Sequence, residues 1–361
     1  MLMTYEQLFN YINKAEQIES HYDSVISRLR IKYEALQNFI STHGNSSMQE
    51  KVPKLKHVCD NIITTIQLIY ANRHAEAYHL LYDTYFADNV KSFLKIYSLK
   101  RDTPLYRMRG AETYVQYVKE TVNEMYHVPF ELRYKVGNDR YNVSGLPTFY
   151  LSSSVYGCWE EIQRANIDFA NVSLFKPIRD LLFLDMTIPP KKKTVQTSEI
   201  MALPLIMAAR LEVQRMGENF IPEYIIPQLA MECLIVARRY NEENPNLMIG
   251  IRYESIHRNK RDLLFNEVDK DDIFINYAIP PFEIADKGVC PQIKKLFEFW
   301  KNTSWAEIRY KNVDVLPLKP KTHYEQSIFG IIEARLNLIP PGMLPYHTRN
   351  IGGIPVGALT Y

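Results

Sequence analysis

The sequence contains no close cysteine pair, no long apolar run and no excess of either charge. Its four cysteines show no CxxC or CxH spacing, which gives no support to a zinc ribbon or a redox motif and favours reduced thiols. The longest apolar stretch, residues 200–209, contains Pro204 and is too short for the roughly 20 residues of a membrane helix. With 43 basic and 41 acidic residues, the formal net charge is +2, which gives no general attraction to nucleic acid.

The sequence also lacks targeting signals and the common catalytic motifs. The first residues, MLMTYEQLFN, have neither the basic region nor the long apolar run of a secretory signal. We therefore expect a cytoplasmic protein that contacts neither membrane nor nucleic acid. The Walker and GxGxxG glycine loops, the HExxH helix and the GxSxG elbow are all missing, which removes several large enzyme classes. No metal-binding motif is present, and we expect no metal ion.

The length and composition allow several regions with buried cores. The chain has 361 residues, of which 46% are apolar, and we expect an α+β protein. Residues 1–98 carry apolar side chains at three-four spacing and are predicted to form an all-α bundle, beginning with one long helix from Leu8 to Ile40. Residues 99–290 mix both patterns and are predicted to form a single α+β domain. Residues 291–361 are predicted to be a helical and loop extension packed on that domain.

Turn-forming residues separate short segments that we interpret as strands. They are LYRMR (105–109), ELRYKV (131–136), TFYLSS (148–153), LLFLDM (181–186), 247–253 and 272–278. Helical spacing predicts helices near 156–165, 199–215 and 222–240, and also in KKLFEFWKN and EQSIFGIIEARL. The last residues are rich in proline and glycine, which favours a loop.

The most informative stretch runs from Arg140 to Glu161, RYNVSGLPTFYLSSSVYGCWEE. It places a cation and turn residues, including Asn142, before a strand that carries Tyr150, and a carboxylate on the helix that follows. A guanidinium pairs with phosphate and a tyrosine ring stacks on another flat ring, so this set suits a dinucleotide. A carboxylate at the same corner can stabilise positive charge on a sugar while a glycosidic bond breaks.

This stretch resembles the RES domain, whose pattern is close to R-[FYW]-N-x-x-G-x-P-x-x-Y-L followed by a glutamate on the next helix. Two further markers of the family have counterparts, Arg107 in LYRMR and Ser255 in GIRYESIHRNKRDLLF. The resemblance covers residues 100–280. It implies an ADP-ribosyltransferase-like fold that binds NAD as a substrate and either degrades it, as a glycohydrolase or phosphorylase, or transfers ADP-ribose. Many such proteins are toxins of bacterial toxin–antitoxin pairs.

Carried over position by position, the resemblance implies roles for six residues. The catalytic set would be Glu161, Arg107 and Ser255, and the substrate-binding set Arg140, Tyr150 and Asn142. In these sets the two arginines anchor NAD, the tyrosine stacks on a ring, the glutamate is the catalytic acid group and the serine lines the site.

Several neighbouring residues compete for these roles. Glu160 is the alternative to Glu161, and Arg109 is the alternative to Arg107. Gln228 is a further site candidate in a segment with looser similarity. His257, two positions after Ser255, is interpreted as a structural or surface residue, because no third group that would orient it can be identified.

Three hypotheses follow for the function. The leading hypothesis is an enzyme that cleaves the nicotinamide–ribose bond of NAD, with water or phosphate as acceptor. The second keeps the site but transfers ADP-ribose to a protein, and the third is a catalytically silent NAD-binding module in which the N-terminal bundle carries the biological role. The expected partners are NAD, a neutralising antitoxin or a protein acceptor, and a second copy of the chain bound through the N-terminal helices.

Overall fold

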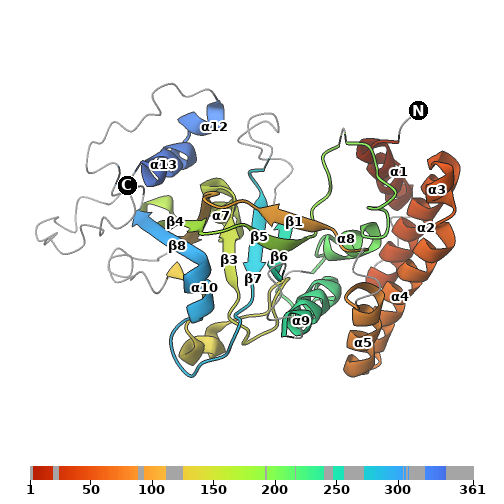
Figure 1. The fold of residues 1–361 in the computed structure, drawn as a ribbon, viewed down its shortest axis with the longest axis horizontal. Helices are drawn as coiled ribbons and strands as arrows, with labels where there is room; N and C mark the ends of the chain where they lie inside the picture. The colour runs from red at the N-terminus through yellow and green to blue at the C-terminus, as the bar shows by residue number, and fades with distance from the viewer. Residues whose placement is uncertain are drawn as a thin grey trace, which may run out of the picture.

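The computed structural model describes residues 3–18, 24–87, 93–110, 125–191, 193–215, 217–239, 247–255, 272–303, 305, 308 and 322–338. In these ranges, helices make up the N-terminal part and a curled, mixed eight-stranded sheet follows (Figure 1). The predicted α+β class is confirmed, and an ADP-ribosyltransferase-like fold remains a prediction. None of the helices in these ranges combines the length and the apolarity that crossing a membrane requires.

The elements of the described chain have the following bounds. The α-helices are α1 (Tyr5–Ile18), α2 (Val25–His43), α3 (Ser46–Gln49), α4 (Val52–Tyr70), α5 (His74–Tyr85), α7 (Val155–Glu161), α8 (Leu203–Ala209), α9 (Ile225–Arg239), α10 (Pro291–Leu296), α12 (His323–Gln326) and α13 (Ile328–Asn337). Short 3₁₀ helices are η3 (Phe130–Lys135), η4 (Ile167–Phe169) and η5 (Pro222–Tyr224). The strands are β1 (Ile96–Leu99), β2 (Leu105–Arg109), β3 (Phe149–Ser152), β4 (Asn171–Pro177), β5 (Leu181–Asp185), β6 (Met248–Glu254), β7 (Ile275–Ile279) and β8 (Phe297–Thr303).

The sheet has the strand order β1-β5-β6-β7-β3-β2-β4-β8. Only the pair β5 and β6 is parallel among the described strands, and the other neighbours are antiparallel. Since successive residues of a strand point to opposite faces, Tyr150 packs into the core shared with α8 and α9, whereas Phe149 packs into a second core on the other face. This alternation decides which predicted site residues can meet.

The N-terminal helices share one buried core with α8 and α9. Two buried tyrosines also cross the contact: the Tyr33 hydroxyl donates to Pro204 O at 2.9 Å, and the Tyr85 hydroxyl donates to Met201 O at 3.2 Å. At the other end of the sheet, α13 packs on α7 and β8, as Figure 1 shows. The helices at both ends of the described chain therefore contribute to the interior around the sheet.

The single long helix predicted from Leu8 to Ile40 is wrong. The structure has two helices that pack on each other, α1 and α2, and the second begins at the N-cap Ser24, whose side chain accepts from Ser27 N at 3.1 Å. Both helices bury their apolar residues on the same core. The regular spacing on either side of residues 19–23 is therefore compatible with two packed helices as well as with one continuous helix.

Two other predicted segments also differ. ELRYKV is part of the 3₁₀ helix η3 and not a strand, and its Tyr134 is 75% exposed, so the alternation of its residues does not correspond to a buried face. KKLFEFWKN is not one helix: α10 begins with Pro291 at its first position, and the chain becomes extended at Phe297, where β8 joins β4. In addition, β1 and β4 were not predicted. The proline- and glycine-rich end falls in 339–361, outside the described residues.

Candidate functional site

The helix that carries Glu161 is fixed against the sheet at its first turn. Ser154 is its N-cap, and the Ser154 hydroxyl accepts from Gly157 N at 2.8 Å. A Cβ atom at Gly157 would lie 2.5 Å from Ser152 Oγ and 2.6 Å from Ile273 O. Only glycine therefore permits this close approach, which sets the position of α7 over β3.

The two neighbouring glutamates at the end of α7 have different environments. Glu160 is buried and forms an ion pair with Arg164, with 3.1 Å between Oε1 and Nη2. Glu161 is half-buried, and its Oε1 accepts from Asn276 Nδ2 at 2.7 Å. The carboxylate of Glu160 is therefore neutralised by a local cation, whereas Glu161 faces the sheet. This geometry favours Glu161 over Glu160 as the functional carboxylate.

Tyr150 and Asn142 are hydrogen bonded to each other, close enough to Glu161 for its charge to act on the Tyr150 phenol. The Tyr150 hydroxyl donates to Asn142 Oδ1, and Asn142 Nδ2 donates to Gly137 O at 3.1 Å. Burial raises the pKa of Tyr150 well above its ordinary value, and the charges of Asp139 and Glu161 raise it further. The phenol therefore stays neutral and acts as a donor. We call the set Glu161, Asn276, Tyr150 and Asn142 the Glu161 corner.

Two more tyrosines surround the corner. Tyr141 and Tyr253 are buried, with ring centroids 4.4 Å apart. Burial raises the pKa of Tyr253, and the negative charge of Glu161 raises it further. Burial also raises the pKa of Tyr141, to about 12. The Glu161 carboxylate thus lies at the border of an aromatic interior of low polarity, where a charge interacts strongly with whatever approaches it.

The Arg140 guanidinium is buried and bound to backbone carbonyls. Arg140 is 7% exposed, and its Nη1 and Nη2 donate to Ala209 O at 2.6 Å and to Leu211 O at 2.9 Å. Its guanidinium also lies over the ring of Tyr224, 5.2 Å from the centroid. Burial lowers the pKa of Arg140. In this arrangement Arg140 holds the motif loop against the end of α8, and two of its donors are already used by backbone carbonyls.

Arg107 lies on the other face of the sheet. Its Nη1 donates to Tyr150 O at 2.8 Å, and its guanidinium lies over Phe149, 5.6 Å from the ring centroid. Phe149 belongs to the core opposite the Tyr150 ring. Arg109, two positions later on β2, shares the face of Arg107. In this structure Arg107 is held at the backbone of Tyr150, on the face opposite the Tyr150 ring.

The remaining candidates lie near the corner or outside the described chain. Ser255 is buried directly after β6, and its N–H donates to Phe274 O at 2.8 Å. Gln228 on α9 donates to Asp139 O at 2.9 Å and to Asn142 O at 3.2 Å, so it holds the motif loop. His257 falls outside the described residues.

Sequence reasoning missed Asn276, which is the direct partner of Glu161. One signal was available: this asparagine is the single amide in the apolar stretch IFINYA of the predicted strand 272–278. A lone amide in a strand that is otherwise apolar needs a hydrogen-bond partner. The identity of that partner could not be read from the chain, because it lies 115 positions away.

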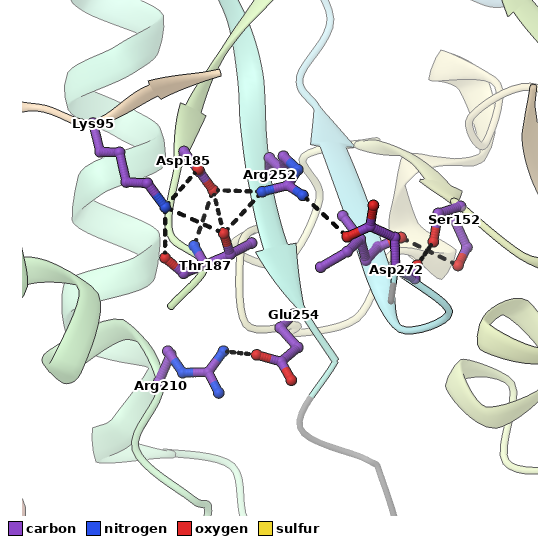
Figure 2. Close-up of polar contacts among 10 residues, drawn as sticks. Lys95, Ser152, Asp185, Thr187, Arg210, Arg252, Glu254 and Asp272 are labelled. Carbon is purple, nitrogen blue, oxygen red and sulfur yellow. Dashed lines mark hydrogen bonds and ion pairs between the residues drawn. The ribbon is translucent and has the colours of Figure 1, made fainter. Parts of the chain in front are cut away.

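A second polar cluster lies at the β5 and β6 end of the sheet (Figure 2). The buried Asp185 carboxylate accepts from Arg252 at 3.0 Å and from the Thr187 hydroxyl at 2.8 Å, and it pairs with Lys95 at 2.8 Å. Arg210 and Glu254 form a separate ion pair at 2.6 Å, drawn as a dashed line in Figure 2. Because both oxygens of Asp185 are occupied by its neighbours, this cluster ties β1 to β5 and β6.

No group of three or more histidine, cysteine, aspartate or glutamate side chains in the described ranges is arranged to hold a metal ion.

The chain was compared with known proteins. It is 26% identical over 321 residues to a protein of Bacillus subtilis (strain 168) named "Putative toxin YopC", and the match covers 79% of this chain and 69% of that protein. No family model matches the chain, and no solved structure matches it. The chain is thus similar, over most of its length, to a protein whose name describes it as a toxin.

Proposed function

We propose that this protein is a toxin that cleaves the nicotinamide–ribose bond of NAD. The observation that carries the proposal is the Glu161 corner, in which a half-buried carboxylate is held by an amide next to a neutral tyrosine. The similarity to a protein named as a toxin supports the biological role. The RES-like motif supports the substrate, because two of its residues, Asn142 and Tyr150, are hydrogen bonded to each other and the charge of a third, Glu161, acts on Tyr150.

The proposed reaction breaks the bond between the ring nitrogen of nicotinamide and C1′ of the ribose. Nicotinamide leaves with the bonding electrons, and positive charge develops on the sugar. A carboxylate in an aromatic surrounding of low polarity stabilises that charge more than it would in water. Water then forms a bond to C1′ through its oxygen and loses a proton, which Glu161 can accept. The products are nicotinamide and ADP-ribose, or ADP-ribose 1-phosphate if phosphate attacks.

In this proposal the other motif residues act around Glu161. Tyr150 offers a ring whose hydroxyl is fixed by Asn142, and this restricts the ring to one orientation. Arg140 contributes indirectly, because its guanidinium binds the carbonyls of Ala209 and Leu211 and so holds the motif loop. Arg107 supports the backbone of Tyr150 from the other face of the sheet.

The test is nicotinamide release from NAD by purified wild-type protein, Glu161→Gln and the neighbouring control Glu160→Gln. We expect Glu161→Gln to lower kcat by about 100-fold or more, because the lost charge acts mainly in the transition state. Glu160→Gln removes only a local ion pair with Arg164 and should stay active. Equal losses in the two variants, or no nicotinamide release by the wild type, would refute the proposal.

Product analysis distinguishes the acceptors. Reactions with and without phosphate separate ADP-ribose from ADP-ribose 1-phosphate. Labelled NAD with a cell lysate shows whether ADP-ribose appears on protein, which would favour the transferase hypothesis over hydrolysis or phosphorolysis.

A further inference from the structure

A buried amide in β7 faces Glu161. Asn276 is 2% exposed, and the other four residues of the strand, Ile275, Tyr277, Ala278 and Ile279, are buried and apolar or aromatic. A polar side chain in such a strand costs free energy unless its atoms are hydrogen bonded. Asn276 Nδ2 donates to Glu161 Oε1 at 2.7 Å, whereas Oδ1 has no hydrogen-bond partner among the described residues. The only side-chain hydrogen bond of Asn276 among the described residues is therefore the one from its NH₂ group to the Glu161 carboxylate.

The two partners differ in how firmly the backbone holds them. Asn276 is paired with Ser152 on β3 and with Tyr253 on β6, so its backbone is fixed on both sides in the middle of the sheet. Glu161 is the last residue of the seven-residue helix α7. A glutamate at a helix end has several rotamers, and fixing one of them costs conformational entropy. A donor on a rigid strand selects the rotamer that it can bond.

We propose that Asn276 is a positioning residue for the Glu161 carboxylate, an inference that rests on the proposed function. Nδ2 fixes Oε1, and in this arrangement Oε2 is the oxygen that faces the reacting sugar. The amide must present its NH₂ group, since an oxygen in that place would put two acceptors against each other. This contact joins β7 to the end of α7, two elements far apart in the chain.

The decisive variant is Asn276→Leu, which keeps the approximate volume and removes the donor. Removing one partner of a hydrogen bond leaves the other unsatisfied and lowers stability, and here the Glu161 carboxylate loses its donor. We expect a lower urea midpoint with the variant still folded, little change in KM for NAD, and a fall in kcat of about 100-fold, the typical effect of a misplaced catalytic group. Ser173→Ala is the control, because it removes another buried polar atom of the sheet that lacks a partner. It should leave kcat unchanged.

An exchanged pair separates positioning from a structural role. The double variant Glu161→Gln with Asn276→Asp keeps one amide and one carboxylate in contact, with the two groups interchanged. It should recover stability that Asn276→Asp alone loses through repulsion between two carboxylates, but it should not recover kcat. A double variant that regains kcat, or Asn276→Leu with wild-type kcat, would overturn the inference.

A structural readout keeps this inference separate from the proposed function. If the wild type releases no nicotinamide, the proposed function fails, and the positioning role is then judged on crystal structures of the wild type and Asn276→Leu. One carboxylate orientation in the wild type and several in the variant would support the positioning role. The same single orientation in both would overturn it.

Discussion

Lowering the pH below about 6.5 should destabilise the protein through one buried histidine. His127 is fully buried; its Nδ1 donates to Val128 O at 2.7 Å, and its Nε2 accepts from Cys290 N at 2.7 Å. Burial lowers the pKa of His127 from the ordinary value near 6.5, and the charges of Arg107 and Lys294 act in the same direction. A protonated imidazole could not accept from Cys290 and would leave that N–H without its acceptor.

The direction of this change in stability follows from how many protons the folded and unfolded chains bind. Below about pH 6.5 the unfolded chain takes up a proton at this histidine while the folded chain does not, so the free energy of unfolding falls as the pH falls. One proton gives at most about 1.4 kcal/mol per pH unit, or about 2 kcal/mol between pH 6.5 and pH 5. The loss ends at the lowered pKa of the folded state, below which both states bind the proton.

The assay is urea unfolding of the wild type between pH 7.5 and pH 5, beside His127→Gln and His79→Gln. A glutamine at 127 does not titrate and can still accept from Cys290. The slope of the variant's unfolding free energy against pH should therefore be smaller than that of the wild type, by the equivalent of up to one proton. His79 is exposed on α5, and its replacement should leave the wild-type slope. If His127→Gln shows the same slope as the wild type, another group causes the pH dependence.

Three further substitutions test the packing around the site by urea unfolding. Glu333→Ala removes the acceptor of Val155 N, a 2.8 Å contact at the start of α7, and should cost about 1–3 kcal/mol; a loss below 0.5 kcal/mol would be inconsistent with this role. Gly157→Ala should cost about 1–3 kcal/mol through overpacking, and an equally stable variant would show that α7 can shift outward. Arg140→Ala should cost about 3 kcal/mol, because two charged hydrogen bonds to backbone carbonyls are lost; weaker NAD binding at unchanged stability would instead favour direct anchoring.

The parts of the fold that could be predicted depend on local sequence. LYRMR, TFYLSS and LLFLDM contain strands in the structure, because aromatic and other apolar residues are bounded there by turn formers. β1 falls almost wholly in the region 1–98, for which the sequence predicts helices, since Tyr97 follows Phe93 at the four-residue spacing of a helix. Its extended form follows from pairing with β5, a contact across more than eighty positions.

The same distinction applies to the candidate site. Asn142, Tyr150 and Glu161 could be grouped from the sequence, because they follow one another around a single loop–strand–helix corner. The position of Arg107 depends on the register of β2 in the sheet, which puts its guanidinium over Phe149. The role of Arg140 depends on where α8 ends, and α8 lies about seventy positions further along the chain. Neither position follows from local spacing.

The shared core beneath α8 has a consequence for any attempt to isolate the RES-like region. All seven residues of α8 are buried, as expected for a helix that is apolar on every side and covered on every side. A fragment starting at residue 99 would lose the helices that contribute Tyr33 and Tyr85 to this contact and would expose apolar surface. Such a fragment should aggregate when expressed alone, so its lack of activity would reflect misfolding and would say nothing about the chemistry of Glu161.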